Sequence, residues 1–231
     1  MTTSDVAGGG PSRSNTLEAR LSDLRNRVAG AGGDPARIRI VAVTKGWGAS
    51  TVAEAAAAGL LDVGENYAQE LVAKAVESPT ALRWHFLGPV QRNKVHRLAP
   101  FVSTWHAIDR EAAVDAVAAA SPDVEVLVQV NLAGGPSRPG CRPGDVDDLV
   151  AHCRRRRVSL TGLMTVGPAA DAAKTRECFR WLAGRARQLG LRELSMGMSD
   201  DFEVAVAEGA TTLRLGRVLF GPRPSPLRVQ R

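Results

Sequence analysis

A lysine stands at the end of the first strand-like segment of this sequence, directly before a glycine. Residues 38–48 read IRIVAVTKGWG, so Lys45 follows a nearly continuous apolar run and precedes Gly46. A lysine that is shielded from water beside other cations has a lowered pKa, and its free amine can attack a carbonyl carbon. The alternative is an ordinary strand-end lysine with a buried stem and a solvated ammonium group.

Two segments near the C-terminus have the composition of a phosphate site. Residues 194–201 read LSMGMSDD, and we expect Ser199 to begin a helix whose first N–H groups can meet an anion. Gly216 ends the last strand-like segment and lets the backbone approach a ligand closely. Asp200 and Asp201 also suit a helix start, so they must either point away from a phosphate or replace it. A capped turn without a ligand is the alternative.

An amine and a phosphate cradle in one site would suit a phosphorylated aldehyde. Pyridoxal 5′-phosphate (PLP) fits both, because its aldehyde can react with Lys45 while the loops at Ser199 and Gly216 hold its phosphate. The sequence therefore predicts a PLP site, provided that the fold brings these three residues together.

Strand and helix periodicities alternate along the whole chain, and this pattern predicts the elements that position the site. A helix over residues 17–28 comes first. The predicted strands, each but the last followed by a helix, are 38–44, 61–66, 83–88, 101–108, 124–132, 158–166, 193–198 and 211–216. Such alternation favours a parallel sheet, and eight units in 231 residues favour a closed barrel. No GxGxxG follows the first strand, which argues against a dinucleotide fold.

We therefore predict an α/β fold, a single (β/α)8 TIM barrel over residues 14–231 with an extra N-terminal helix, preceded by a flexible tail at 1–13. Chemistry in such barrels lies at the C-terminal ends of the strands, and the loops after strands seven and eight commonly bind phosphate. Asn66 ends the second predicted strand and Met164 lies near the end of the sixth, so both belong to the same mouth as Lys45.

Composition excludes some functions and leaves others open. The net charge of +6 favours anionic partners without choosing among them. The basic run Arg154–Arg157 is typical of a solvated helix end, and nucleic acid is not expected as a partner because no basic motif has interleaved aromatic residues. RNA binding by this run and the basic C-terminal tail stays the weaker alternative.

No apolar run is long enough to span a membrane, and the first ten residues lack the pattern of a secretory signal. Three cysteines without a CxxC spacing favour a reduced, cytoplasmic compartment. The four histidines form no HExxH or HxH pair, so no metal site is predicted.

At these residues the sequence resembles the YggS/PROSC family of pyridoxal phosphate homeostasis proteins, which share the barrel of the alanine racemase N-terminal domain. The matching stretches are VAVTKGW (41–47), VGENYAQEL (63–71), RWHFLGPVQRNKV (83–95), VLVQVNLAGGPSRPGC (126–141), LTGLMTVGP (160–168) and LSMGMSDDFEVAVAEGATTLRLGRVLFGPR (194–223). The resemblance implies a cofactor site made of Lys45, as the Schiff-base lysine, Asn66, Met164, Ser199, Arg214, Gly216 and Arg217.

Two of these residues have particular consequences. The resemblance places Arg214 beside the pyridine nitrogen, where a guanidinium can only donate a hydrogen bond and keeps the ring a weak electron sink. Arg217 stands where the family usually has a small hydroxyl residue, so it would bind phosphate through its backbone N–H or its guanidinium.

The resemblance implies a protein that stores or delivers PLP without turnover, and a PLP-dependent amino-acid racemase is the alternative. A two-base racemase needs a second acid or base opposite the lysine, which alanine racemase takes from a second domain. Here the one tyrosine is Tyr67, which we expect to be a packing residue. We therefore predict a non-enzymatic, monomeric, cytoplasmic PLP carrier, with PLP-dependent apoenzymes as candidate recipients.

Overall fold

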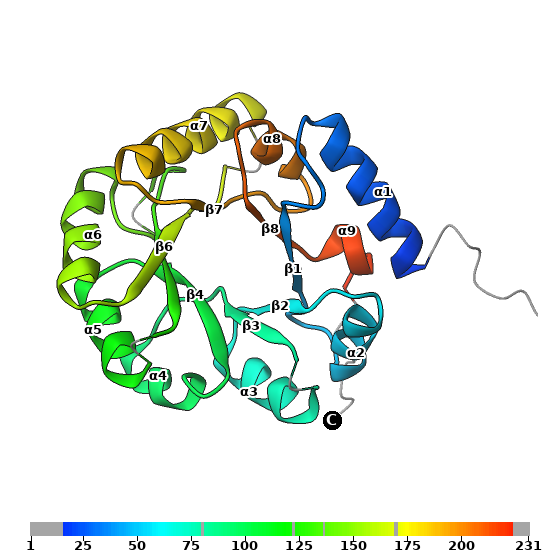
Figure 1. Ribbon diagram of the computed structural model, residues 1–231, viewed down its shortest axis with the longest axis horizontal. Coiled ribbons are helices and arrows are strands. Elements are labelled where there is room, and N and C mark those ends of the chain that lie inside the picture. Colours follow the sequence, from blue (N-terminus) through cyan, green and yellow to red (C-terminus); the bar gives the residue numbers. More distant parts are fainter. Residues whose placement is uncertain (1–15, 80, 122, 136, 169–170, 224–231) are drawn as a thin grey trace, which may run out of the picture.

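The structure, a computed structural model, describes residues 16–79, 81–121, 123–135, 137–168 and 171–223. In this part of the chain, eight parallel strands join in sequence order and close into a barrel, β1-β2-β3-β4-β5-β6-β7-β8 (Figure 1). The predicted (β/α)8 barrel is confirmed. The tail predicted at 1–13 lies outside the described residues, and the domain division remains a prediction.

The strands are short and lie within the predicted segments. They are β1 (Arg39–Val43), β2 (Asp62–Glu65), β3 (Arg83–Phe86), β4 (Val102–Ile108), β5 (Glu125–Gln129), β6 (Ser159–Met164), β7 (Glu193–Ser195) and β8 (Thr212–Leu215). Four residue pairs between β1 and β8, from Arg39–Thr212 to Ala42–Leu215, close the barrel. All strands therefore point the same way, and their C-terminal ends form one mouth.

Helices surround the strands as an outer ring (Figure 1). They are α1 (Leu17–Gly30), α2 (Ala49–Ala57), α3 (Ala68–Glu77), α4 (Arg92–Leu98), α5 (Glu111–Ala120), the 3₁₀ helix η2 (Pro143–Asp145), α6 (Val146–Arg155), α7 (Ala172–Gln188), α8 (Phe202–Ala207) and α9 (Arg217–Phe220). The extra helix α1 buries Leu17, Leu21, Leu24 and Val28, whose spacing places them on one face. This face packs against α8 and α9.

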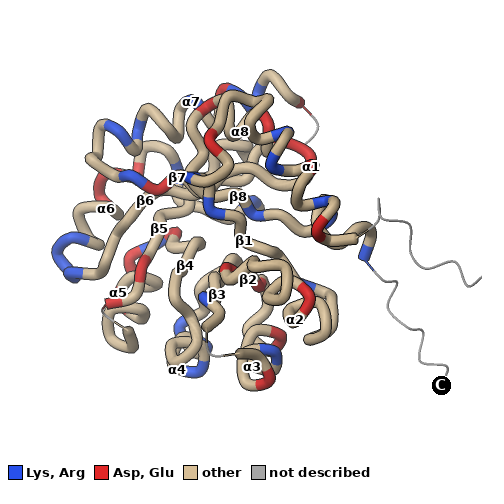
Figure 2. Tube along the Cα trace, turned by 45° about the vertical axis from the view of Figure 1, so that its right-hand side comes forward, with Lys and Arg blue, Asp and Glu red and all other residues tan. Residues whose placement is uncertain are grey.

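The basic run at the end of α6 takes part in contacts with its neighbours. Arg154 donates to the carbonyl oxygen of Leu189 at 2.7 Å, and Arg156 pairs with Asp115 at 3.0 Å. Figure 2 shows basic residues gathered where α6 ends. These contacts favour the interpretation of the run as a helix end.

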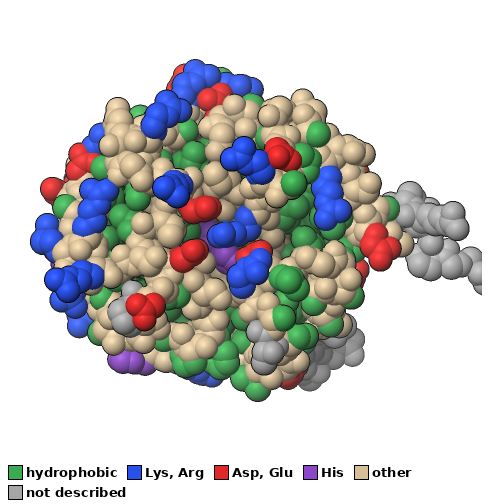
Figure 3. All heavy atoms as spheres, viewed as in Figure 1, with side chains coloured by type: hydrophobic (Ala, Val, Ile, Leu, Met, Phe, Trp, Pro, Cys, Tyr) green, Lys and Arg blue, Asp and Glu red, His purple; other side chains and the backbone are tan. Residues whose placement is uncertain are grey.

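Polar side chains occupy much of the barrel interior. The buried ones include Thr44, Glu65, His85, Thr104, His106, Gln129, Ser195, Thr212 and Arg214. In the view along the barrel axis, basic and acidic side chains lie around a histidine at the centre (Figure 3). Buried polar groups need hydrogen-bond partners, so side-chain pairing inside the barrel helps to determine the geometry at its mouth.

The cysteines and the helices bear on the predicted cellular environment of the protein. Cys141, Cys153 and Cys178 are all free thiols. In the described part of the chain, no helix has the length and apolar character needed to cross a membrane. The cytoplasmic location stays a prediction.

Candidate functional site

Lys45 lies at the C-terminal end of β1, in a cavity of about 270 Å³. Gly46 after it has a φ of +76°, which a residue with a side chain rarely adopts, so the glycine allows the chain to turn away at once. Burial, followed by the positive charges of Arg223 and Arg214, lowers the pKa of Lys45. The direction of this shift is the one expected from the position of Lys45.

Helix α3 holds the backbone on both sides of Lys45. The N–H of Gly46 donates to Glu70 Oε2 at 2.9 Å, and Lys74 Nζ donates to the carbonyl oxygen of Thr44 at 2.8 Å. Lys74 also pairs with the fully buried Glu65 at 2.6 Å. Burial raises the pKa of Glu65, although the hydrogen bonds from Lys74 and Thr44 oppose this effect. Side chains of β2 and α3 thus anchor the end of β1.

The loops after β7 and β8 meet at Ser199. Its Oγ accepts a hydrogen bond from the N–H of Val218 at 3.2 Å, near the start of α9. At Gly216 an added Cβ would lie 3.2 Å from the carbonyl oxygen of Val43, so a side chain would crowd the end of β1. The hydroxyl of Ser199 and the backbone around Gly216 therefore face the same space as Lys45.

The prediction that Ser199 begins a helix is wrong, because α8 begins only at Phe202. The reason is Asp201, whose carboxylate accepts the N–H of Met198 at 2.6 Å and closes a turn before the helix starts. Asp200 forms an ion pair with the guanidinium of Arg217. The two carboxylates are thus engaged with the turn and with Arg217.

Arg214 brings a buried positive charge to the cavity. Its guanidinium donates to Ser195 Oγ at 2.7 Å and to the carbonyl oxygen of Thr165 at 2.8 Å. Among the described residues, both hydrogen-bond partners are neutral oxygens. Burial lowers the pKa of Arg214 to about 10, against the opposing charge of Asp201. The guanidinium remains charged at neutral pH. These two hydrogen bonds use two of its five N–H groups.

The structure brings all the predicted site residues together. The cavity is lined by Lys45, Asn66, Met164, Ser199, Arg214, Gly216 and Arg217. Their roles toward a cofactor stay predictions. Tyr67 is not the packing residue that we expected, because it is 62% exposed. It is also absent from this lining.

Six further lining residues were not predicted from the sequence: Val43, Trp47, Leu87, Val166, Met198 and Arg223. Trp47 belongs to the VAVTKGW stretch, and its ring lies 5.9 Å from that of Phe220. Arg223 follows the last strand and carries no strand-end signal. Its charge nevertheless contributes to the lowered pKa of Lys45.

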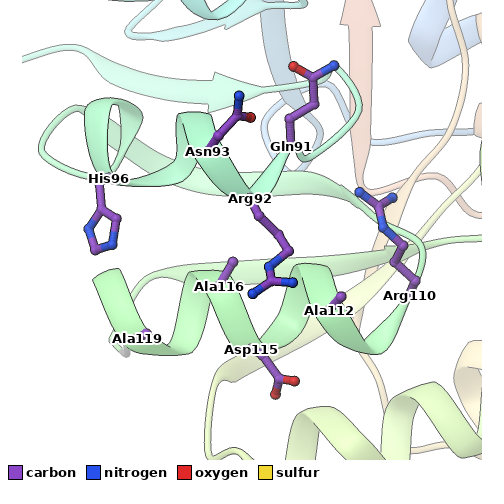
Figure 4. Close-up of a pocket in the computed structure, with 9 residues that line it drawn as sticks. All are labelled: Gln91, Arg92, Asn93, His96, Arg110, Ala112, Asp115, Ala116 and Ala119. Atoms are coloured by element: carbon purple, nitrogen blue, oxygen red, sulfur yellow. The ribbon is translucent and has the colours of Figure 1, made fainter.

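A larger cavity of about 850 Å³ lies on the outside of the barrel between α4 and α5. Arg92 and His96 extend from α4 toward α5, over a floor of alanines (Figure 4). This groove contains none of the predicted site residues, and most of its lining comes from α4 and α5 on the outside of the barrel. The smaller cavity at Lys45 is therefore the candidate functional site.

Fold and site together define a class of protein: a parallel (β/α)8 barrel with a lysine of lowered pKa after its first strand, facing a serine and a glycine from the loops after its last two strands. The comparisons agree with this class. The family described as alanine racemase, N-terminal domain, matches residues 13–224. An alanine racemase from Clostridium difficile has a similar fold, with a TM-score of 0.68, 14% identity, and coverage of 89% of this chain and 60% of the enzyme.

Curated relatives narrow the class. The pyridoxal phosphate homeostasis protein of Pseudomonas aeruginosa is 40% identical over 87% of this chain and 91% of its own length. That of Escherichia coli K12 is 35% identical over 90% and 97%. PipY of Synechococcus elongatus PCC7942, solved with PLP bound, has a TM-score of 0.75 at 32% identity and covers 89% of this chain and 100% of PipY. The chain belongs to the alanine racemase N-terminal domain family, in its group of pyridoxal phosphate homeostasis proteins.

Proposed function

We propose that this protein binds pyridoxal 5′-phosphate through a Schiff base to Lys45 and serves in PLP homeostasis. The observation that carries the proposal is the meeting of a lysine of lowered pKa with Ser199, Gly216 and Arg214 in one cavity of about 270 Å³. This volume lies near the lower end of the range for small-molecule sites, about 300 Å³, and so suits a compact cofactor.

The chemistry of the donor groups fits each part of PLP. The amine of Lys45 suits the aldehyde, and the hydroxyl of Ser199 with the backbone beside Gly216 suits the phosphate. Arg214 can donate a hydrogen bond to the ring nitrogen but accepts none. PLP when bound supplies an electron sink, and an arginine at this nitrogen weakens it. The names of the relatives and the PLP-bound form of PipY support the same assignment.

We further propose that the protein carries PLP without turning over an amino acid. Apart from Lys45, the described residues that line the cavity include no Tyr, His, Cys, Asp or Glu. A racemase needs a second group that exchanges a proton on the opposite side of the substrate. The exposed Tyr67 lines a neighbouring cavity with Asn66 and remains the candidate for such a group if turnover occurs.

The first test is an absorption spectrum of the purified protein with PLP, before and after borohydride, followed by peptide mapping. We expect a visible band and a label trapped on Lys45. Lys174→Ala, which removes an exposed lysine on α7, is the matched control and should leave the band unchanged. A label spread over surface lysines, or an unchanged band in Lys45→Ala, would refute the site.

The absence of turnover and the partners need separate measurements. Racemisation of a free amino acid that is lost in Lys45→Ala would refute the carrier role and support the racemase. Recipients are proposed to be PLP-dependent apoenzymes, which transfer from the loaded protein to a purified apoenzyme would test. Sedimentation at several concentrations would test the predicted monomer.

A further inference from the structure

A chain of hydrogen-bonded side chains crosses the inside of the barrel and ends at Arg214. The guanidinium donates to Ser195 Oγ, which lies 2.9 Å from His106 Nδ1. His106 Nε2 lies 2.8 Å from His85 Nδ1. His85 Nε2 in turn lies 2.9 Å from Asp62 Oδ1. We call these five residues the buried polar chain, since each is 7% exposed or less.

The buried polar chain connects the two ends of the barrel. Asp62 is the first residue of β2, and its carboxylate pairs with the half-exposed Arg83 at the N-terminal end of the strands. At the other end, Arg214 lines the cavity that contains Lys45. The intermediate residues lie on β3, β4 and β7. Because the barrel is closed, side chains of these strands meet inside it and form one network.

Donor and acceptor chemistry gives the buried polar chain one direction. Arginine can only donate hydrogen bonds, so Ser195 Oγ accepts from Arg214. The Ser195 hydroxyl can then donate a hydrogen bond to His106 Nδ1. His106 then donates from Nε2 to His85 Nδ1, and His85 donates from Nε2 to Asp62. This direction requires both imidazoles to be neutral and to carry their proton on Nε2. In this arrangement every bond has one donor and one acceptor.

The charges around the chain support this direction. Burial alone raises the pKa of Asp62, but hydrogen bonds from His85 and Arg83 outweigh it and keep the carboxyl pKa below its ordinary range. Burial first, and then the positive charges of Arg214 and Arg39, keep the pKa of His106 well below its ordinary value. A carboxylate at one end and a neutral imidazole in the middle are what the direction requires.

The opposite direction leaves a group without a partner. If His85 were an imidazolium, His106 would donate from Nδ1 to Ser195, which would then accept from both His106 and Arg214. In the described part of the chain, the Ser195 hydroxyl proton would have no other acceptor at hydrogen-bond distance. An unpaired buried hydroxyl is unfavourable, so the direction that ends at Asp62 is preferred.

We propose that Asp62, His85, His106 and Ser195 are positioning residues, which fix the Arg214 guanidinium without placing a carboxylate against it. The positive charge thus stays available to the cavity instead of being neutralised by an ion pair. The inference rests on the proposed function, because the group that meets this charge is then the ring of PLP. It adds a determinant of the cofactor site at the opposite end of the barrel.

The first test needs no cofactor. Long-range nitrogen-15 NMR of the histidine rings in the PLP-free protein at neutral pH should show His85 and His106 as neutral Nε2–H tautomers. The asparagine in Asp62→Asn can either accept from or donate to His85 Nε2, so any Nδ1–H form that appears there should appear in both rings together. Glu125→Gln removes a carboxylate on β5 that is not part of the buried polar chain, and it should change neither ring. An imidazolium or an Nδ1–H form in the unsubstituted protein would overturn the proposal.

The second test measures PLP affinity. Ser195→Ala should weaken PLP binding about tenfold, the effect of losing a hydrogen bond to a charged group, while Ser195→Thr keeps the hydroxyl and most of the affinity. Asp62→Asn should also weaken PLP binding, and this variant replaces Ser195→Ala in the test if Ser195→Ala fails to fold. Glu125→Gln should leave PLP binding unchanged. Unchanged affinity in both Ser195→Ala and Asp62→Asn would overturn the proposal. If the unsubstituted protein does not bind PLP, the proposed function fails instead, and the NMR result still decides the direction of the chain.

Discussion

Replacement of Lys74 by methionine tests how the end of β1 is held in place. Lys74 Nζ donates to Glu65 at 2.6 Å, to the carbonyl oxygen of Thr44 at 2.8 Å and to Glu70 at 3.2 Å. The Glu65 side chain is fully buried and that of Lys74 is 7% exposed. Lys74→Met would therefore leave the buried carboxylate of Glu65 without its counter-ion. It would also remove the donor to the carbonyl oxygen of Thr44.

The size of the effect follows from this burial. Removing one partner of a buried ion pair destabilises a protein by about 3–5 kcal/mol. For a chain of this length, each kcal/mol lowers the melting temperature by about 2–4 °C, so we expect a decrease of roughly 10 °C. The pair of variants Glu65→Gln and Lys74→Met, combined in one chain, should recover most of the loss, because the remaining amide is uncharged and can still accept from Thr44.

The loss in Lys74→Met should also depend on pH. Burial already raises the pKa of Glu65, and removal of Lys74 takes away the main opposing effect. A carboxyl with a raised pKa in the folded state stabilises folding below its unfolded value of about 4.3 and loses that contribution as pH rises through the folded pKa. The difference from the unsubstituted protein should therefore be small near pH 4 and grow toward neutral pH.

Urea unfolding of the single and double variants between pH 4 and pH 8 would measure these differences. A destabilisation below about 1 kcal/mol at pH 8, or one that is the same at every pH, would refute the buried-pair explanation. Failure of the double variant to recover stability would show that Lys74 acts through packing and not through the charge of Glu65.

Three further predictions concern reactivity, ligand binding and stability. Because the pKa of Lys45 is lowered, its labelling by an aldehyde and cyanoborohydride should rise with pH and level off at a lower pH than the labelling of N-acetyl-lysine amide. Mass spectrometry would measure both profiles, and equal profiles would contradict the lowered pKa. Ser199→Ala should weaken PLP binding about tenfold in an equilibrium titration and lower the free energy of unfolding by only about 1 kcal/mol, because one hydrogen bond is lost; unchanged affinity would remove Ser199 from the phosphate site. Leu24→Ala, at a fully buried position on α1, should lower the free energy of unfolding by about 2–5 kcal/mol; a loss below about 1 kcal/mol would show that α1 is not part of the cooperative fold.

Much of the fold could be predicted because its signals are local. Runs such as 124–132 have the apolar character of a buried strand, and the helical spacing of Leu17, Leu21, Leu24 and Val28 recurs between such runs in other helices. Once the strands are known, the parallel order places their ends at one mouth. That is why residues as distant as Lys45 and Gly216 could be assigned to one site, whereas Arg214 was assigned through the family resemblance.

The remaining features depend on contacts between distant segments. The start of α8 was misplaced because Asp201 binds the Met198 N–H and delays the helix, a choice that capping patterns alone do not reveal. Arg223 lines the cavity because the chain after α9 brings it beside Gly46, which no local pattern reveals. His85 and His106 lie 21 residues apart without a motif, and the register between β3 and β4, which includes an irregularity, decides that their rings meet.

The position and the charge state of Lys45 have separate origins in this barrel. Its backbone is held by Glu70 and Lys74 of α3, which bind the N–H of Gly46 and the carbonyl of Thr44. Its pKa is lowered by burial and by arginines that come from β8 and from the chain after it. Because different elements set the two properties, the amine can stay in one place while its charge responds to what occupies the cavity. An anionic ligand that neutralises the arginines would raise the pKa of Lys45 again, whereas a covalent bond to its amine removes that charge. A site of this kind favours a ligand that combines an anionic group with an electrophilic carbon, and PLP has both.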